Sequence, residues 1–234
     1  MIQPSGIKSK YFVVHLCALV IIASYSFCSF AFAAEQVDEE KPTVFELAVF
    51  GFFRAADKAP DYDRCVDLYI QIVREQESFV DLFICETMAS IKEAKAAVAA
   101  AKTSGKSVWC GLTLEDNEKC ELRSGEKLIE SVNELQSLGQ EEFLLNCSFP
   151  EVIDKGIKIL SQNAKFFGGY GNGFTSIEPL KTASNVSVLS ARTDLGPKKY
   201  SEHALNWAKH GASVIGGCCE IGPRHIKYLY DRLN

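Results

Sequence analysis

The sequence of 234 residues has no excess of basic charge. Its 25 lysine and arginine residues are outnumbered by 30 aspartate and glutamate residues, which gives a formal net charge of −5 at pH 7. A broad basic face is therefore excluded, and the balance argues against nucleic acid as a partner. Because hydrophobic residues make up 47% of the chain and charged residues 24%, wholesale disorder is excluded as well.

Two familiar sequence patterns are also missing. No Gly-x-Gly-x-x-Gly motif follows the first expected strand, which disfavours a dinucleotide-binding fold. The nine cysteines are too sparse for a small disulfide scaffold, although they are many for an intracellular chain. Length alone allows one large domain or two small ones.

Charge is absent from the segment between Phe12 and Ala33. Two lysines and no acidic residue precede it, and it ends in small residues, a pattern suited to signal peptidase. We therefore expect residues 1–34 to be a signal-like or membrane-anchor segment with a hydrophobic leader helix, and residues 35–43 to be a linker. The run is about long enough to span a bilayer. The alternatives are a buried core segment and a misassigned start of the reading frame.

From residue 44 onward, strand-like and helix-like segments alternate. Apolar runs predict strands at 44–53, 80–85, 107–114, 142–145, 166–170 and 212–217. Capping boxes at 90–93 and 148–151 each open a helix. Residues 186–189 are compatible with a short strand or with part of a long loop. Repeated strand–helix units with near-continuous apolar strands imply a parallel sheet with helical cover, an α/β fold.

Polar and thiol side chains stand at the carboxyl ends of these expected strands. The residues at these ends are Glu86, Cys147, Asn172, Cys218 and Cys219. In a barrel of alternating strands and helices, that end is where the chemistry is built. The pattern therefore predicts that these side chains surround one site.

The tandem Cys218-Cys219 is the most informative of these features. Neighbours in a regular strand point to opposite faces, so both thiolates reach one metal only if the strand breaks there. Gly216-Gly217 before the pair and Gly222-Pro223 after it permit such a break. With Cys147, the pair would supply three thiolates, as in a catalytic zinc site with one open position. The alternative is that these cysteines are small buried apolar residues.

These motifs resemble the homocysteine S-methyltransferase family, whose members include betaine–homocysteine methyltransferases. The matching stretches are Cys85-Glu86-Thr87 with Ser90 to Ala94, Asn146-Cys147-Ser148 with Pro150-Glu151, Tyr170 to Phe174, and Gly216 to Cys219 with Gly222-Pro223 and His225-Ile226. The resemblance covers roughly residues 44–234. It implies a homocysteine-binding (β/α)8 TIM-type barrel domain over these residues.

The resemblance also implies an activity and a cofactor. Family members transfer a methyl group from a small-molecule donor to the thiol of homocysteine, which gives methionine. The zinc ligands of the family correspond to Cys147, Cys218 and Cys219. No catalytic residue beyond this metal site is implied.

The same resemblance assigns one residue to substrate binding, and two asparagines at strand ends are further candidates. Glu86 corresponds to the family glutamate that holds the ammonium group of homocysteine; its alternative is a carboxylate at the entry of a helix. Asn146 orients a ligand or merely ends a strand. Asn172 lines the pocket or belongs to an ordinary glycine-rich turn.

The N-terminal part of the chain departs from the family pattern. The family opens with an Asp-Gly-Gly strand and a second strand, and neither pattern is present, so we expect an incomplete barrel of about strands three to eight. Three functions follow as alternatives: an active zinc-dependent methyltransferase, an inactive truncated remnant that binds zinc or homocysteine, and a membrane-anchored interaction protein.

The methyl donor and the compartment are expectations of the same kind. No cobalamin- or folate-binding module follows Cys219, which favours a small donor such as S-methylmethionine, S-adenosylmethionine or a betaine-like compound. The resemblance implies a cytoplasmic enzyme, because a reducing compartment keeps thiolates available for zinc. The leader implies instead the secretory pathway or a membrane, contacted only through residues 12–33.

Overall fold

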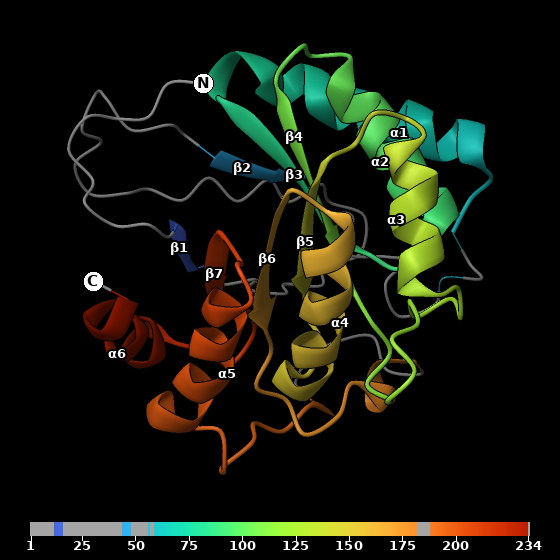
Figure 1. Ribbon diagram of the computed structural model, residues 1–234. Coiled ribbons are helices and arrows are strands. Elements are labelled where there is room, and N and C mark those ends of the chain that lie inside the picture. Colours follow the sequence, from blue (N-terminus) through green and yellow to red (C-terminus); the bar gives the residue numbers. More distant parts are fainter. Residues whose placement is uncertain (1–11, 16–43, 48–55, 57–58, 182–187, 234) are drawn as a thin grey trace.

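The computed structural model of the protein describes residues 12–15, 44–47, 56, 59–181 and 188–233. Within these residues, seven strands form one sheet in which every neighbouring pair is parallel. Helices follow the strands along the chain and lie outside the sheet (Figure 1). The predicted α/β fold of the barrel type is therefore confirmed.

The elements have the following bounds. The strands are β1 (Phe12–His15), β2 (Val44–Leu47), β3 (Leu82–Met88), β4 (Ser107–Leu112), β5 (Glu142–Asn146), β6 (Phe166–Gly171) and β7 (Val214–Gly217). The helices are α1 (Tyr62–Gln76), α2 (Ile91–Lys102), α3 (Leu128–Gln136), α4 (Pro150–Asn163), α5 (Pro197–Lys209) and α6 (Pro223–Leu233), with short 3-10 turns η2 (Glu77–Phe79) and η3 (Glu178–Lys181).

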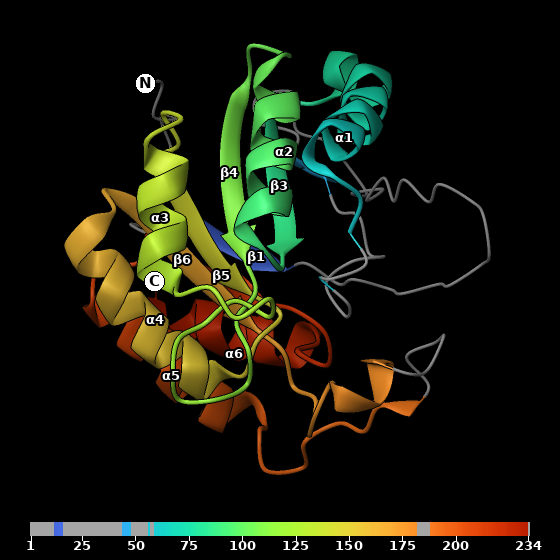
Figure 2. The ribbon, with the colours of Figure 1, turned by 90° about the vertical axis from the view of Figure 1, so that its right-hand side faces the viewer.

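The strand order across the sheet is β1-β7-β6-β5-β4-β3-β2. From β3 to β7 the order follows the chain, as successive right-handed strand–helix units require. In the view turned by 90°, α2, α3, α4 and α5 lie side by side along the sheet (Figure 2). In the part of the chain that the structure describes, no strand joins β1 to β2, so the sheet has two edges and does not close.

The first strand corrects the prediction for the N-terminal segment. β1 pairs in parallel with β7, with Phe12 opposite Val214 and His15 opposite Gly217. A leader helix beginning at residue 12 is therefore wrong for Phe12–His15. A short apolar run suits a strand as well as a helix, and the open edge of β7 provides backbone partners. The rest of the predicted leader and the linker, residues 16–43, lies outside the described residues.

Among the described residues, we find no helix with the length and apolar character needed to cross a membrane. A strand at residues 186–189 is one of two alternatives. Val188 and Leu189 belong to no strand, and residues 186 and 187 lie outside the described residues.

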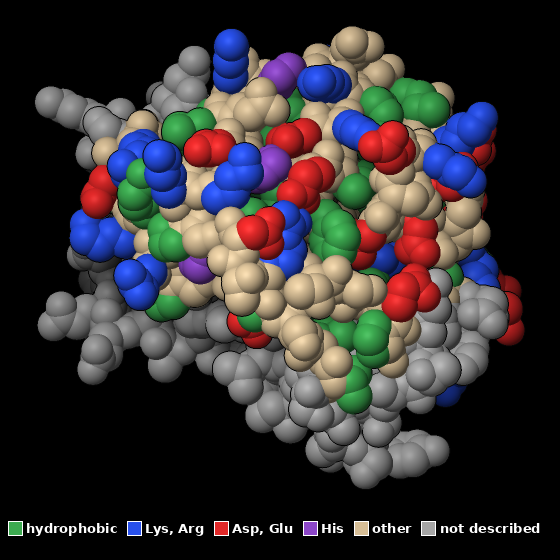
Figure 3. Space-filling view, turned by 90° about the horizontal axis from the view of Figure 1, so that it is seen from below, with side chains coloured by type: hydrophobic (Ala, Val, Ile, Leu, Met, Phe, Trp, Pro, Cys, Tyr) green, Lys and Arg blue, Asp and Glu red, His purple; other side chains and the backbone are tan. Residues whose placement is uncertain are grey.

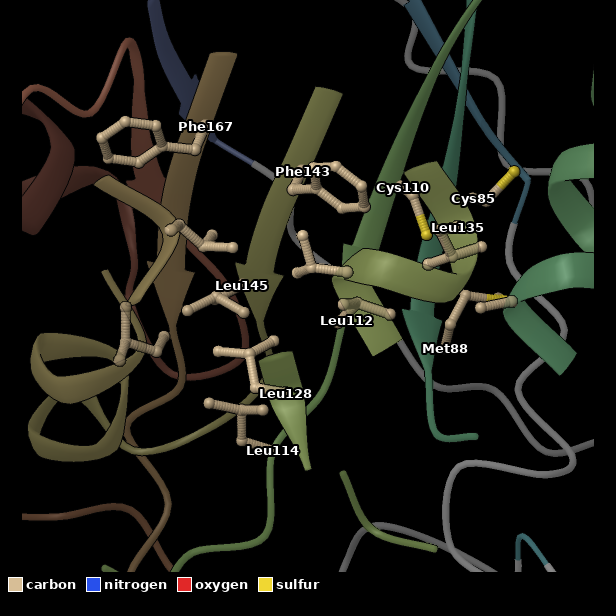
Figure 4. Close-up of a cluster of buried hydrophobic side chains, with 14 of the residues drawn as sticks. Cys85, Met88, Cys110, Leu112, Leu114, Leu128, Leu135, Phe143, Leu145 and Phe167 are labelled. Carbon is tan, nitrogen blue, oxygen red and sulfur yellow. The ribbon is translucent and has the colours of Figure 1, made fainter. Parts of the chain in front are cut away.

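The core is divided between the two faces of the sheet. On the outer face, side chains of alternate strand residues, such as Cys85, Phe143 and Phe167, pack beneath the helices (Figure 4). On the inner face, Ile84 and Leu144 belong to a second, smaller buried cluster. Each fully buried side chain of this size contributes about 1.5–3 kcal/mol relative to exposure. Burial on both faces explains why the strands read as continuous apolar runs.

The two predicted capping boxes have different outcomes. At the start of α2, the Ser90 hydroxyl accepts a hydrogen bond from the Glu93 N–H at 3.2 Å, as predicted, whereas the Glu93 carboxylate accepts from the N–H of Ala89 instead of closing the box at Ser90. The second box is wrong, because α4 begins one residue later than the motif requires and Phe149 precedes it without a side-chain cap. The hydroxyl of Ser148 instead accepts a hydrogen bond from the N–H of Leu114 at 2.8 Å, in the segment after β4.

Candidate metal centre

Three cysteine side chains converge where β5 and β7 end. The sulfur atoms of Cys147, Cys218 and Cys219 all lie within 4.8 Å of one another, and those of Cys218 and Cys219 are 3.8 Å apart. All three residues are buried. Tetrahedral Zn–S bonds of about 2.3 Å hold sulfurs about 3.8 Å apart, so this donor set fits a zinc ion after a small contraction.

The backbone after β7 brings the adjacent thiols to the same side. The strand ends at Gly217, and the N–H of Ile221 donates to the carbonyl of Cys218 at 3.0 Å, which closes a turn. A Cβ atom at Gly217 would lie 2.7 Å from the Cβ of Ile221 and even closer to its Cγ2, so this turn requires glycine. The predicted break in the strand is therefore present, and glycine makes it possible.

The third thiol depends on an unusual backbone conformation. Cys147 has φ 49°, in the left-handed region that non-glycine residues rarely adopt. Its N–H donates to the carbonyl of Tyr170 at 3.2 Å, and the N–H of Cys218 donates to the carbonyl of Gly171 at 2.9 Å. The end of β6 therefore ties together the two segments that carry the thiols.

The three thiols share their charge unequally. Hydrogen bonds from Cys218 and Cys219 hold the pKa of Cys147 well below its usual value, against the opposing effect of burial, and the charge of Arg123 lowers it further. The pKa of Cys218 and that of Cys219 are raised, because each faces the thiolate of Cys147 and both are buried. The protein alone therefore favours one negative charge here, and three thiolates require a cation.

Glu86 stands on the inner face at the end of β3. It follows Leu82 and Ile84 in the strand alternation and is 1% exposed. The pKa of Cys219 is raised mainly by Cys147, and the Glu86 carboxylate adds to that shift. This carboxylate therefore lies within electrostatic reach of the thiols, as its position at a strand end predicts.

Asn146 holds the end of β3 in place. Its Oδ1 accepts a hydrogen bond from the Thr87 N–H at 3.1 Å, and its Nδ2 donates to the Thr87 hydroxyl at 2.7 Å. Thr87 has φ 62°, a genuine outlier for a β-branched residue. Both polar atoms of the Asn146 amide thus fix the residue that follows Glu86.

Asn172 follows β6 and is fully buried. Its Oδ1 accepts a hydrogen bond from the Phe174 N–H at 3.2 Å. The Asn172 amide is among the groups that lower the pKa of Cys147. The amide of Asn172 therefore faces the thiol of Cys147.

Two residues at the centre were not predicted from the sequence. Arg123, in the segment between β4 and α3, donates from NH2 to the carbonyl of Cys147 at 3.0 Å. Tyr200 of α5 donates its hydroxyl to the carbonyl of Gly216 at 2.6 Å and accepts from the N–H of Gly171 at 2.9 Å. Neither has a local sequence signal, because each contact joins segments that are distant in the chain.

Other polar residues at this end of the molecule pair with one another. Arg192 binds both carboxylate oxygens of Glu151, at 2.8 and 2.9 Å, and also binds Asp194. The side chains of His203 and His225 contact Asp154 and the carbonyl of Leu195, away from the thiols. Seen from below, side chains of both charge signs are interspersed on this face (Figure 3).

Comparison with known structures establishes the fold independently. Homocysteine methyltransferase MmuM from Escherichia coli, in its metallated form, is similar with a TM-score of 0.61 at 21% identity, over 78% of this chain and 56% of that chain. The apo form of the same enzyme gives a TM-score of 0.61 at 16% identity, over 82% and 63%. The chain thus spans less than two thirds of the length of these relatives.

The sequence itself matches a family model. The model of the family described as homocysteine S-methyltransferase matches residues 25–233, so the match begins within the predicted leader and extends beyond the resemblance seen from residue 44. The three converging cysteines, the buried glutamate and strands β2 to β7 all fall inside the matched residues, whereas β1 lies before them. The chain belongs to the homocysteine S-methyltransferase family.

Proposed function

We propose that the chain is a zinc-dependent methyltransferase that moves a methyl group from a small-molecule donor to the thiol of homocysteine, giving methionine. The observation that carries this proposal is the convergence of three buried cysteine sulfurs within 4.8 Å, in a chain of the homocysteine S-methyltransferase family. Three sulfur ligands are the protein contribution expected of a catalytic zinc site, which keeps one position for substrate.

Cys147, Cys218 and Cys219 would hold the metal. When bound, zinc supplies a Lewis acid that keeps the homocysteine thiol deprotonated at neutral pH, where an ordinary thiol with a pKa of about 8.5 is mostly protonated. The turn after β7 and the left-handed backbone at Cys147 orient the three cysteine side chains before a metal ion binds. Burial of all three cysteines limits the access of water to the metal that they would hold.

Glu86 would bind the ammonium group of homocysteine. A carboxylate that is 1% exposed forms a stronger ion pair than one in water, and it lies within electrostatic reach of the thiol cluster. Asn172, whose amide faces Cys147, would line the substrate pocket. Asn146 would act on the substrate through Glu86, because both atoms of its amide already bond to Thr87.

For the donor, we retain S-methylmethionine, S-adenosylmethionine and betaine-like compounds. Each presents a methyl group on a positively charged centre to the homocysteine sulfur. No disulfide links the seven cysteines of the described residues, and thiols this close require a reducing compartment to remain reduced. A cytoplasmic location agrees with this requirement.

A remnant that binds zinc without turnover is the second candidate. The observation in its favour is the sheet of the described residues, whose edges β1 and β2 are not joined. An open sheet admits water and lets the ligand-bearing strands move, and a misplacement of 1 Å can cost about 100-fold in rate.

The test combines metal analysis with a methionine-formation assay on the purified chain, with zinc, homocysteine and each donor class. We expect one zinc per chain, and loss of both zinc and methionine formation in Cys147→Ser. Cys120→Ser is the matched control, because this cysteine lies outside the thiol cluster. One zinc without methionine supports the remnant, and a wild-type chain that binds no zinc refutes both candidates.

A further inference from the structure

Arg123 is a buried cation on a segment that the proposed reaction leaves without a role. The segment between β4 and α3 folds back on itself through antiparallel bridges, Leu114 with Leu122 and Glu121 with Lys127. The Arg123 side chain is only 5% exposed. A buried arginine needs partners for its donors, so its contacts show what the segment does.

The guanidinium group binds four groups at once. Nε donates to the Thr113 hydroxyl at 3.1 Å, and NH1 donates to Glu115 at 3.2 Å. NH2 lies 3.5 Å from a carboxylate oxygen of Asp116 and donates to the carbonyl of Cys147 at 3.0 Å. The Thr113 hydroxyl lies 3.4 Å from that same carbonyl. The planar fork of arginine permits this set of directed contacts, and a lysine ammonium does not.

The Cys147 carbonyl is the important member of this set. A hydrogen bond to the carbonyl fixes the orientation of the peptide that follows Cys147, a residue held in the left-handed region with φ 49°. Rotation of this peptide toward ordinary backbone angles would carry the thiol away from the other two. The next residue is anchored to the same segment, since Ser148 bonds to Leu114 and the Phe149 N–H donates to Asp116 at 2.9 Å.

We propose that Arg123 is a positioning residue for the metal centre, holding Cys147 in the conformation that presents its thiol to the other two. This inference rests on the proposed zinc site. The role is geometric rather than purely electrostatic, because the carboxylates of Glu115 and Asp116 offset the positive charge of Arg123. The direction of the fork, which a lysine ammonium does not reproduce, is therefore what orients the Cys147 carbonyl.

The test measures zinc affinity of the full chain by competition with a chromophoric chelator, for wild type, Arg123→Lys and Arg123→Met. We expect both variants to bind zinc about 10- to 100-fold more weakly, the range for partners that orient metal ligands. With cobalt(II) in place of zinc, we expect both variants to show a weaker thiolate charge-transfer band per bound ion, because the thiol of Cys147 no longer coordinates the metal.

Arg192→Met is the matched control. Arg192 is also a largely buried arginine paired with two carboxylates, but its partners are Glu151 and Asp194 and it makes no contact with Cys147. We expect its zinc affinity and cobalt spectrum to stay at the wild-type values. Thermal unfolding of each metal-free variant shows which of them fold. Arg123→Lys keeps a positive charge opposite Glu115 and Asp116. If Arg123→Met does not fold, the zinc affinity of Arg123→Lys alone tests whether Arg123 positions Cys147.

The outcomes separate this inference from the proposed function. If the wild type binds zinc and Arg123→Lys binds it with the same affinity, the geometric role of Arg123 is overturned. The proposed zinc site is then unaffected. Unchanged affinity in Arg123→Met overturns any role of this residue. A wild-type chain that binds no zinc overturns the proposed function and this inference with it.

Discussion

Glu93 should make the stability of the protein depend on pH in an unusual direction. This residue of α2 is fully buried, and its carboxylate bonds to the Ala89 N–H at 3.2 Å and to the Tyr69 hydroxyl at 3.3 Å. Burial raises its pKa from 4.5 to about 7, although both hydrogen bonds oppose the shift. Between these two values the folded chain holds a proton that the unfolded chain has released.

The contribution of Glu93 to the free energy of unfolding should therefore fall as the pH rises from about 4.5 to about 7. Above pH 7 this contribution should stay constant. A shift of this size corresponds to about 3 kcal/mol, since each pKa unit is worth about 1.4 kcal/mol. Glu93→Gln removes the charge and keeps a polar group facing Ala89 and Tyr69. At pH 8 we expect the variant to be about 2 kcal/mol more stable than wild type, after about 1 kcal/mol for a weakened hydrogen bond.

The assay is urea unfolding of both proteins at several pH values between 4 and 8, with the difference between them plotted against pH. Glu151→Gln is a control of opposite sign. Burial alone would raise the pKa of Glu151, but Arg192 outweighs it and lowers the pKa, so this carboxylate stabilises the fold above its unfolded pKa and loses that effect as the pH falls. A Glu93→Gln difference that is flat or that reverses sign with pH would refute the reasoning.

Three further predictions concern the strands and the site. Gly168→Ala should destabilise the fold by about 1–3 kcal/mol in urea unfolding, because the new Cβ would lie 2.6 Å from the Cβ of Val214 and would collide with its carbonyl oxygen; equal stability would contradict this. Asn146→Ala should leave the buried Thr87 N–H without its acceptor, costing about 1–3 kcal/mol, and should raise the KM for homocysteine more than it weakens zinc binding; a loss confined to zinc would count against a role through Glu86. Zinc affinity should weaken as the pH falls from 8 to 6, about tenfold per pH unit for each proton displaced, because the two thiols with raised pKa values must lose protons on binding; a pH-independent affinity in competition titrations would contradict it.

Much of the fold was predictable because its signals are local. The runs that form β3 to β7 are continuous and apolar, since both faces of the sheet are buried. Cys147 and the Cys218-Cys219 pair stand directly at strand ends, and parallel strands bring their carboxyl ends to one edge. That the three thiols lie near one another therefore follows from the positions of the strand ends, whereas their final placement depends on the turn after β7 and on the left-handed backbone of Cys147.

The remaining features depend on contacts between distant segments. Phe12–His15 is a strand only because β7 offers it an edge, and a short apolar run does not specify this partner. The sequence at Ser148 predicts a helix cap, yet its hydroxyl accepts a hydrogen bond from the N–H of Leu114 instead. Arg123 reaches Cys147 across 24 residues of chain, from a segment without periodicity. In each case a tertiary partner decided the outcome.

The position of β7 in the chain has a consequence for biosynthesis. This strand precedes two of the three candidate ligands, and its partner β1 lies far earlier in the chain, so that pairing Phe12 with Val214 closes a loop of about 200 residues. Chains fold from the N-terminus as they are synthesised, and pairings this distant form slowly. The thiol of Cys147 therefore meets its two partners only after synthesis has passed Cys219, so a nascent chain that stops before this residue cannot assemble the candidate metal centre.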